Sequence, residues 1–342
     1  MTYLTGKIAL DITAGAPNNG RGENNMGVVK KLWVGREVYP YVSAQAFRRW
    51  LRDSVPPGEP RSPVTREGQG KKQQAYTAGR PDLYLDDDLF GYMVAIKNED
   101  FLQRDTVLAT GTLVSVAPRR PEPDFGTMSR GFPADTHPVI HEHELYSAEL
   151  AGDILLDLPR AGTFEQEGGG SRRALRADAA AEAISAGARE TRFRDVPSIQ
   201  LPLPERRRRV AVLLRTLAEV RGGAQRALHY GDRSPVLVLL APIKGGNNPF
   251  TRVLHVKDHH VRFNEQAFAE ELSAWAGELD GPVLIGWAPG FLGDQREHAR
   301  MMFDAEISNS RLVIDHPRTV LRGLADDIES GKRDGWFEDP HA

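Results

Sequence analysis

The residues best suited to chemistry in this 342-residue chain are cations, amides and glycines gathered around one loop. The segment from Ala14 to Gly27 is rich in Gly and Asn, a composition typical of a loop with exposed donors. Because guanidinium, amide and backbone N–H groups all donate to phosphate oxygens, their convergence favours phosphate binding over a merely solvated charged face. The polar candidates in and around this loop are Asn18, Asn19, Arg21, Asn24, Asn25, Lys30, Lys31, Arg48, Arg49 and Arg52.

The distribution of charge supports a polyanionic partner. The formal net charge is only -3. Residues 18–52, however, hold seven Lys/Arg against two Asp/Glu, residues 61–80 hold five against one, and residues 172–226 hold thirteen against six. A cationic surface on an otherwise acidic protein is typical of proteins that bind nucleic acid, and the acidic remainder keeps such a protein in solution.

Other common chemistries lack their signature in the sequence. With zero cysteines, thiol nucleophiles, disulfides and cysteine zinc motifs are excluded. No Gly-rich loop ending in Lys-Ser/Thr, no Gly-x-Gly-x-x-Gly after a strand and no Gly-x-Ser-x-Gly elbow occurs, so nucleotide hydrolysis, dinucleotide binding and that class of hydrolase lack their usual motifs. His137, His141 and His143 have no fixed carboxylate partner, and Pro138 interrupts their segment. We therefore expect no metal site and no cofactor.

Three charged or imidazole groups admit more than one interpretation. Asp11 lies on the outward parity of the first expected strand and could act as an acid or base, but orienting the adjacent loop is the favoured role. The run Arg206–Arg209 begins a helix, where cations oppose the helix dipole. It indicates either a bound anion or partner carboxylate, or a solvated run. His259 and His260 are expected on opposite faces of a strand, with a structural role.

The elements that must position these residues follow from hydrophobic periodicity. Strands are predicted over residues 4–13, 106–116, 144–158 and 235–243, and helices from Ser43 to about Asp53 and from Pro204 to Gly222. Strand, helix, strand, strand, helix, strand is the order of the α+β ferredoxin-like or RNA-recognition fold. In the C-terminal third, an element over 253–263, a strand over 282–287 and helices over 265–277 and 317–330 extend the same domain.

The segments between these elements are predicted to be insertions. Residues 55–80 form an insertion rich in Pro, Gly, Lys and Gln, and residues 162–203 form a second one with a helix within 172–188. Residues 117–143 form a long, proline-broken projecting connection. No stretch reaches the roughly eighteen apolar residues of a membrane helix, so we expect no membrane partner. The expected location is the cytoplasm.

Three ordered stretches resemble the DevR-type family of CRISPR-associated proteins, the seventh Cas family within the RAMP superfamily. They are Arg36–Arg49 after the Asn/Gly loop, Asp86–Met93, and Gly222–Gln225 leading to Gly231–Pro235. The resemblance covers mainly residues 3–53, 82–116, 144–158 and 200–250. Members of this family form the repeated backbone subunit of type I Cascade complexes, so the resemblance implies a non-catalytic protein that polymerises along the CRISPR RNA (crRNA) and presents it to target DNA.

The resemblance also implies a right-hand shape. The palm would comprise residues 1–54, 106–116, 144–161 and 204–342, the last range including the C-terminal extension. The fingers would comprise residues 55–105, the thumb hairpin residues 117–143, and a variable insertion residues 162–203. The implied partners are crRNA, target DNA through guide pairing, neighbouring copies of the chain, and the handle-capping and large subunits.

By position, the resemblance assigns RNA contacts to further residues. Beside the first set, Ser43 and Gln45 would hold phosphates, and Gly222, Gly223, Gln225 and Arg226 would form a second wall. In the thumb, aromatic and apolar side chains would stack on or wedge between bases while cations neutralise phosphates. These thumb residues are Arg119, Arg120, Phe125, Met128, Arg130 and Phe132.

Two enzymatic alternatives and one structural alternative remain open. A RAMP endoribonuclease would cut target RNA with a metal and an acidic residue such as Asp11 or Glu23. A guide-processing endoribonuclease would use His, Tyr or Lys as general acid and base. A structural oligomer would bind no nucleic acid at all.

Overall fold

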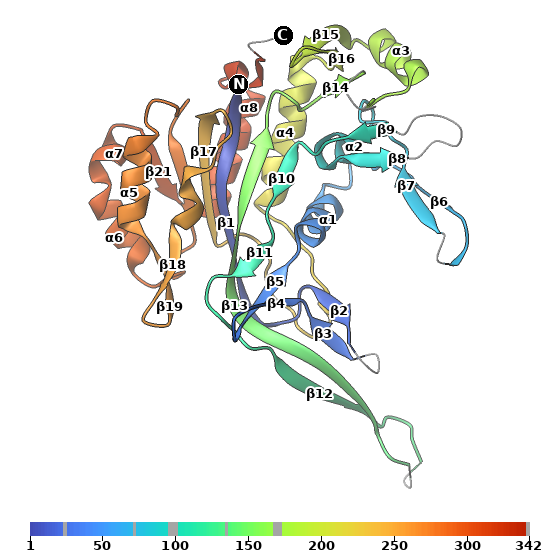
Figure 1. Cartoon of the computed structure of the whole chain (residues 1–342), viewed down its shortest axis with the longest axis vertical. Coiled ribbons are helices and arrows are strands. Elements are labelled where there is room, and N and C mark those ends of the chain that lie inside the picture. Colours follow the sequence, from blue (N-terminus) through green and yellow to red (C-terminus); the bar gives the residue numbers. More distant parts are fainter. Residues whose placement is uncertain (23–25, 71–72, 95–101, 134–135, 167–172, 340–342) are drawn as a thin grey trace.

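The protein is an α+β chain built on one large sheet. The computed structural model describes residues 1–22, 26–70, 73–94, 102–133, 136–166 and 173–339 (Figure 1). Asn24 and Asn25 therefore lie outside the described residues. The helices are α1 (Ala44–Ser54), α2 (Leu85–Phe90), α3 (Ala177–Ser185), α4 (Leu203–Leu217), α5 (Glu265–Ala274), α6 (Gln295–Met302), α7 (Asp304–Ser308) and α8 (Pro317–Glu329), with 3-10 turns η3 (Pro249–Arg252) and η4 (Asp334–Phe337).

The strands occur in one large sheet and several small ones. The strands up to residue 115 are β1 (Thr2–Gly15), β2 (Asn19–Arg21), β3 (Gly27–Val29), β4 (Lys31–Val34), β5 (Glu37–Val42), β6 (Val64–Glu67), β7 (Gln74–Thr77), β8 (Tyr92–Val94), β9 (Leu102–Arg104), β10 (Leu108–Thr110) and β11 (Leu113–Ser115). The others are β12 (Glu122–Met128), β13 (Val139–Asp157), β14 (Thr163–Glu165), β15 (Arg189–Phe193), β16 (Val196–Gln200), β17 (Leu237–Lys244), β18 (Leu254–Lys257), β19 (His260–Phe263), β20 (Val283–Trp287) and β21 (Leu312–Asp315).

The centre of the large sheet has the predicted ferredoxin-like topology. Its strand order is β21-β20-β17-β1-β13-β11-β5-β4. Within it, β17, β1, β13 and β11 are neighbours, and each of their three pairings is antiparallel. If these four core strands are numbered by their order in the chain, their order across the sheet is fourth, first, third, second. The C-terminal third extends the same sheet through β20 and β21, as expected.

Both faces of the sheet are covered over most of β1. Leu4, Ile8 and Leu10 belong to a core that α1, α4 and α8 complete on one face. Ala9 faces the opposite way into a second core with β17, β20 and α5. The prediction of a strand with a single buried face is therefore wrong before residue 10, because the C-terminal elements cover the second face (Figure 1).

Helix α1 forms as its sequence predicts. The Ser43 hydroxyl caps it by accepting a hydrogen bond from the Ala46 N–H at 3.3 Å. Phe47, Trp50 and Leu51 are buried, and the arginines lie on the other side. Helix α4 ends at Leu217 rather than at Gly222, although Val220 beyond it is still buried.

The segment between β11 and β13 contains a regular hairpin. Strand β12 pairs with the first part of β13 from Glu122↔Leu145 to Met128↔Val139, and this hairpin projects from the body (Figure 1). Pro123 is accommodated because β12 pairs on one side only. Similarly, β6 and β7 form a hairpin inside the segment predicted as a loose insertion.

Two further sequence predictions are corrected. Asp258 and His259 have positive φ angles of 50° and 62° and form the turn between β18 and β19, so His259 is not a strand residue. The insertion at 162–203 contains the sheet β14-β16-β15 packed with α3, which is shorter than the predicted helix. These three-residue to five-residue strands carry too little periodicity to be recognised in sequence.

Candidate nucleic-acid interface

The two loops predicted as opposing walls meet beside α1. The Ala224 N–H donates to the Pro17 carbonyl at 2.9 Å, which joins the loop of residues 221–234, here named the second loop, to the first loop of residues 16–30. The Asn18 side-chain oxygen accepts from the Ser43 N–H at 2.9 Å, which joins the first loop to the start of α1. Residues distant in the sequence thus form one continuous surface.

Glycines permit this close approach. A Cβ on Gly222 would lie 2.5 Å from Trp50 Cβ, so the second loop can lie against α1 only where a side chain is absent. Gly223 has a φ of +98°, which disfavours any L-residue with a side chain. The Gly-Gly pair is therefore a geometric requirement of the junction, whatever the junction binds.

An arginine-rich cleft opens where α1, α4 and the second loop come together. It is lined by Arg49, Arg61, Arg215, Arg221, Arg226 and Arg322, together with Gly222, Gly223 and the acidic residues Asp53 and Glu219. Arg215 pairs with Asp326 and Glu329, and Arg322 pairs with Glu219. Arg49 pairs with Asp53 at 2.7 Å, but both side chains are exposed. Within the described ranges, Arg61, Arg221 and Arg226 have no carboxylate partner, so the cleft retains unneutralised positive charge.

The three α1 arginines that were predicted to bind phosphate lie in different environments. Arg49 faces the cleft. Arg48 donates to the Thr110 hydroxyl at 3.3 Å, and its burial, followed by the charge of Arg52, lowers the pKa of its guanidinium. Arg52 lies 3.6 Å from Asp86 and stacks 5.2 Å over the Phe90 ring. Arg52 is thus engaged by the protein itself, and of the three Arg49 is the most open.

The first loop keeps only part of its predicted donor set free. Lys31 forms an ion pair with Glu144, whose other oxygen accepts from the Val29 N–H at 2.9 Å. Both side-chain polar atoms of Asn19 are buried without a partner in the described part of the chain, so they are not exposed donors as the sequence predicted. The structure describes the backbone of Arg21 in β2. Lys30 has no carboxylate partner among the residues described.

The remaining polar candidates differ in their availability. Ser43 is committed to capping α1, whereas Gln45 is exposed on the first turn. Gln225 has a φ of +52°, and its side-chain oxygen is buried without a hydrogen-bond partner among the described residues. Arg226 is exposed beside it.

The predicted thumb residues do not form one surface. Phe125 and Met128 are 61% and 52% exposed, but their parity on β12 puts them on opposite faces of the hairpin. Arg119 lies at the base of the hairpin, 3.3 Å from Glu149, and is not a free cation. Arg120 and Arg130 are exposed, and Phe132 lies in the turn that its N–H closes with the Ser129 carbonyl.

The arginine run at the start of α4 is structural. Arg206 is buried and donates to the carbonyls of Ala161, Pro159 and Phe337. Arg209 is also buried and pairs with Asp88 at 2.9 Å. The interpretation as a solvated run is wrong for these two residues, since carbonyls and a carboxylate of the same chain satisfy them.

Asp11 lies near the end of β1, before the first loop. It is exposed and opposite Glu149 in the β1–β13 pair, with no hydrogen bond to the described part of the loop. Partial burial, followed by the charge of Glu149, raises the pKa of its carboxyl. The role of Asp11 in orienting the loop stays a prediction.

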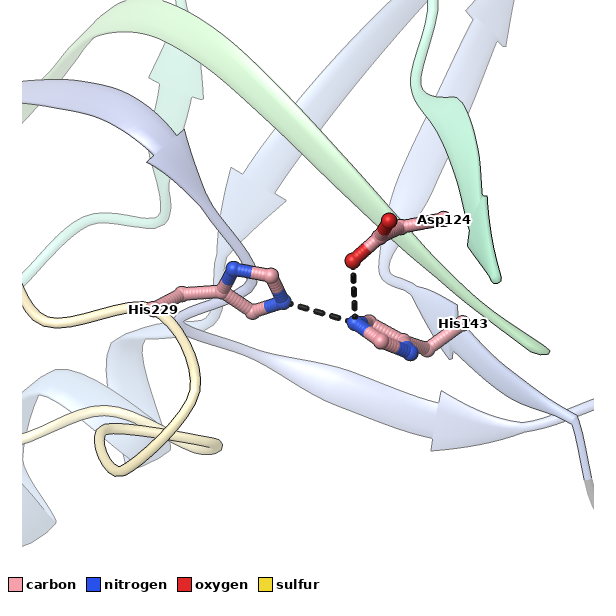
Figure 2. Close-up of side chains that lie close together, drawn as sticks. All are labelled: Asp124, His143 and His229. Carbon is pink, nitrogen blue, oxygen red and sulfur yellow. Dashed lines mark hydrogen bonds and ion pairs between the residues drawn. The ribbon is translucent and has the colours of Figure 1, made fainter. Parts of the chain in front are cut away.

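An imidazole and carboxylate cluster lies at the base of the hairpin, and the sequence did not indicate it. Figure 2 shows Asp124 of β12, His143 of β13 and His229 of the second loop pointing toward one another. The Nε2 atoms of the two histidines are 2.7 Å apart, and Asp124 Oδ2 is 3.0 Å from His143 Nε2. His137 and His141, which the sequence pairs with His143, are exposed and outside this cluster.

Other exposed residues of the interface also escaped prediction. Tyr230 and Leu228 of the second loop are 80% and 68% exposed. Arg61 lies in the segment predicted as a loose insertion, yet it donates to the Asp53 and Val55 carbonyls and lines the cleft. An aromatic residue between the Gly222–Gly223 pair and Asp232–Arg233 was the available signal for Tyr230.

Comparisons with known proteins identify the fold. No protein-family model and no curated protein matches the chain. Among solved structures, a chain of a "CRISPR RNA-guided surveillance complex" is similar with a TM-score of 0.53 and 14% identity, covering 95% of this chain and 99% of that one. A chain of a "CRISPR RNA-guided surveillance complex, pre-nicking" is similar with a TM-score of 0.54 and 12% identity, covering 96% and 99%. The architecture is therefore that of chains found in such complexes, over nearly the full length of both. Separately, no described helix is both long and apolar enough to cross a bilayer.

Proposed function

We propose that this chain is a guide-RNA-binding backbone subunit of a type I CRISPR surveillance complex and a member of the DevR-type family. The observation that carries the proposal is the fold shared with surveillance-complex chains over 95% of this chain. The arginine-rich cleft beside the Gly222–Gly223 junction supplies the chemistry for an RNA backbone.

The cleft suits a phosphate backbone better than a specific base sequence. The cations without a carboxylate partner in the described ranges come from two segments, with Arg61 after α1 and Arg221 and Arg226 on the second loop. Together they suit an extended anionic chain. Phosphate contacts of this kind fix position without reading sequence. In RNA-guided recognition, sequence is read by base pairing between guide and target. A backbone subunit needs no catalytic group for this role, and we propose a non-catalytic protein.

The projecting hairpin supplies a contact with a neighbouring copy and with the guide. Exposed apolar side chains occur on both of its faces, with Phe125 on one and Met128 and Val139 on the other. A two-sided apolar projection suits insertion between RNA bases and an adjacent subunit. Head-to-tail contacts then give a helical filament on the crRNA, with target DNA joining by guide pairing and other complex subunits at the ends.

The test is binding of guide-length single-stranded RNA by the purified chain at several salt concentrations. Tight, salt-sensitive and length-cooperative binding without cleavage is expected. RNA cleavage by the wild-type chain, lost in Asp11→Ala or Glu23→Ala, would transfer the protein to the metal-dependent RAMP nucleases. Cleavage of repeat RNA in the presence of a chelator would instead favour a guide-processing enzyme.

A further inference from the structure

We propose that Asp124, His143 and His229 bind a divalent transition-metal ion of the zinc type. The three side chains come from β12, β13 and the second loop, and one ligand atom from each lies within 4.8 Å of the others (Figure 2). The test of this site uses metal ions without RNA, so its outcome does not depend on the proposed function.

Hydrogen bonding alone does not satisfy these atoms well. His143 Nε2 faces His229 Nε2 at 2.7 Å and Asp124 Oδ2 at 3.0 Å. A neutral imidazole nitrogen carries either one hydrogen or one lone pair, so this single atom serves two partners at once only with a shared, weakened bond. A cation placed between the three atoms accepts a lone pair from each, which removes the conflict.

The donor set selects the class of metal. Two imidazole nitrogens and one carboxylate oxygen are ligands of Zn²⁺ and its neighbours in the transition series, whereas Mg²⁺ and Ca²⁺ prefer oxygen ligands throughout. His143 is 9% exposed, while Asp124 is about half exposed, so one side of the cluster is open to solvent. Water can therefore complete a tetrahedral set, with three protein ligands and one open position.

The strand register prepares two of the three ligands. Asp124 and His143 are direct cross-strand partners in the hairpin, on the face opposite Phe125. Gly27 pairs with His143 from the first loop, and a Cβ on Gly27 would lie 3.1 Å from Gln225 Nε2 in the second loop. Only His229 belongs to a loop without regular structure. A bound metal would thus fasten the second loop to the base of the hairpin.

The experiment uses the full chain stripped of metal with a chelator and titrated with Co²⁺, then with Zn²⁺ in competition. We expect one Co²⁺ per chain with visible absorption bands of a four-coordinate ion, displaced by one Zn²⁺. His229→Ala and Asp124→Asn should each weaken Zn²⁺ binding by about 10-fold or more. Zn²⁺ should also raise the unfolding temperature of the wild type and not of His229→Ala.

His141→Ala is the matched control because His141 lies two residues from His143 on the same face of β13 but outside the cluster. It should bind Co²⁺ like the wild type. Asp124→Asn tests the site with an isosteric, exposed change, so misfolding does not confound the result. Absence of stoichiometric Co²⁺ binding by the wild type, or equal binding by wild type, His229→Ala and Asp124→Asn, would overturn the proposal and leave a hydrogen-bonded triad.

Discussion

Arginine serves opposite purposes in two regions of this molecule. In one region, Asp88 of α2 pairs with Arg104 of β9 and Arg209 of α4, and both arginines are almost completely buried. In the cleft between α1 and the second loop, Arg221 and Arg226 have no carboxylate partner within the part of the chain described. The first group joins parts of the fold, and the second is free for a ligand.

The difference shows that local density of basic residues does not indicate where a polyanion binds. Asp88 also accepts from the Gly162 N–H at 3.0 Å, so one carboxylate connects α2, β9, α4 and the start of the 162–203 insertion. Charges buried in this way require mutual compensation, whereas exposed charges are stabilised by water. What distinguishes the two groups is the presence of a buried carboxylate, which composition does not reveal.

The largest predicted effect comes from removing that carboxylate. Asp88→Ala removes the buried carboxylate that Arg104 and Arg209 share, and leaves only Glu165, 3.9 Å from Arg104, and the partly exposed Glu205, 2.7 Å from Arg209. We expect the free energy of unfolding to fall by about 3 kcal/mol, the lower end for a broken buried pair. Urea denaturation measures the change. Arg215→Ala is the control, because Arg215 forms partly exposed pairs with Asp326 and Glu329 and should cost no more than about 1 kcal/mol. Equal losses in the two variants would remove the distinction between the regions.

The second prediction concerns the cleft. Arg49→Glu with Arg226→Glu should strongly weaken binding of guide-length RNA while leaving the unfolding midpoint almost unchanged. Loss of two phosphate contacts should also reduce the slope of log K against log salt by about 1.4. Fluorescence anisotropy at several salt concentrations provides both values.

The matched control for this double variant reverses two remote charges. Arg300 and Arg311 are exposed, and Arg300 lies on α6 on the far side of the sheet. Arg300→Glu with Arg311→Glu makes the same change in net charge and should leave most of the RNA affinity intact. If both double variants lose affinity equally, the binding is a property of net charge and not of the cleft.

The third prediction separates the shape of the cleft from its charge. Gly222→Ala keeps every arginine but forces a side chain against Trp50, so we expect a loss of about 1–3 kcal/mol in stability together with weaker RNA binding. Gly58→Ala is the control, because nothing lies within 4 Å of a Cβ built there. Unchanged RNA affinity in Gly222→Ala would mean that the cleft is not the interface.

The sequence predicts much of the fold because the central elements are strongly periodic. The strands at β1 and β17 and the capped helix α1 form where predicted, and their order gave the ferredoxin-like topology that the sheet shows. Short strands such as β14 and β21 were missed, since three or four residues carry almost no periodic signal.

The candidate site was less predictable because it depends on partners distant in the chain. Nothing near Lys31 in the sequence indicates that Glu144 neutralises it, and nothing near His143 indicates His229, which lies in another loop. Conversely, Gly222 and Gly223 were identified through a resemblance, and in the structure Gly222 lies against Trp50 of α1 and Gly223 beside Pro17 of the first loop. Pairing of side chains is decided by the tertiary fold, which a single sequence does not specify residue by residue.

The smallest predicted effect is opposite in sign to that of Asp88→Ala. It comes from Asp11, a carboxylate outside the group around Asp88. Asp11 is a carboxylate that lies opposite Glu149, and partial burial, followed by the charge of Glu149, raises its pKa. The folded state therefore holds the Asp11 proton more tightly than the unfolded state does, so stability falls as the pH rises through the raised pKa. Asp11→Asn removes this penalty and should be slightly more stable than the wild type near about pH 7, with the gain vanishing toward about pH 3. Solvent screening keeps the effect small because Asp11 is exposed. Urea midpoints across this pH range measure it, and destabilisation of Asp11→Asn at neutral pH would mean that this carboxylate, like that of Asp88, has a stabilising partner.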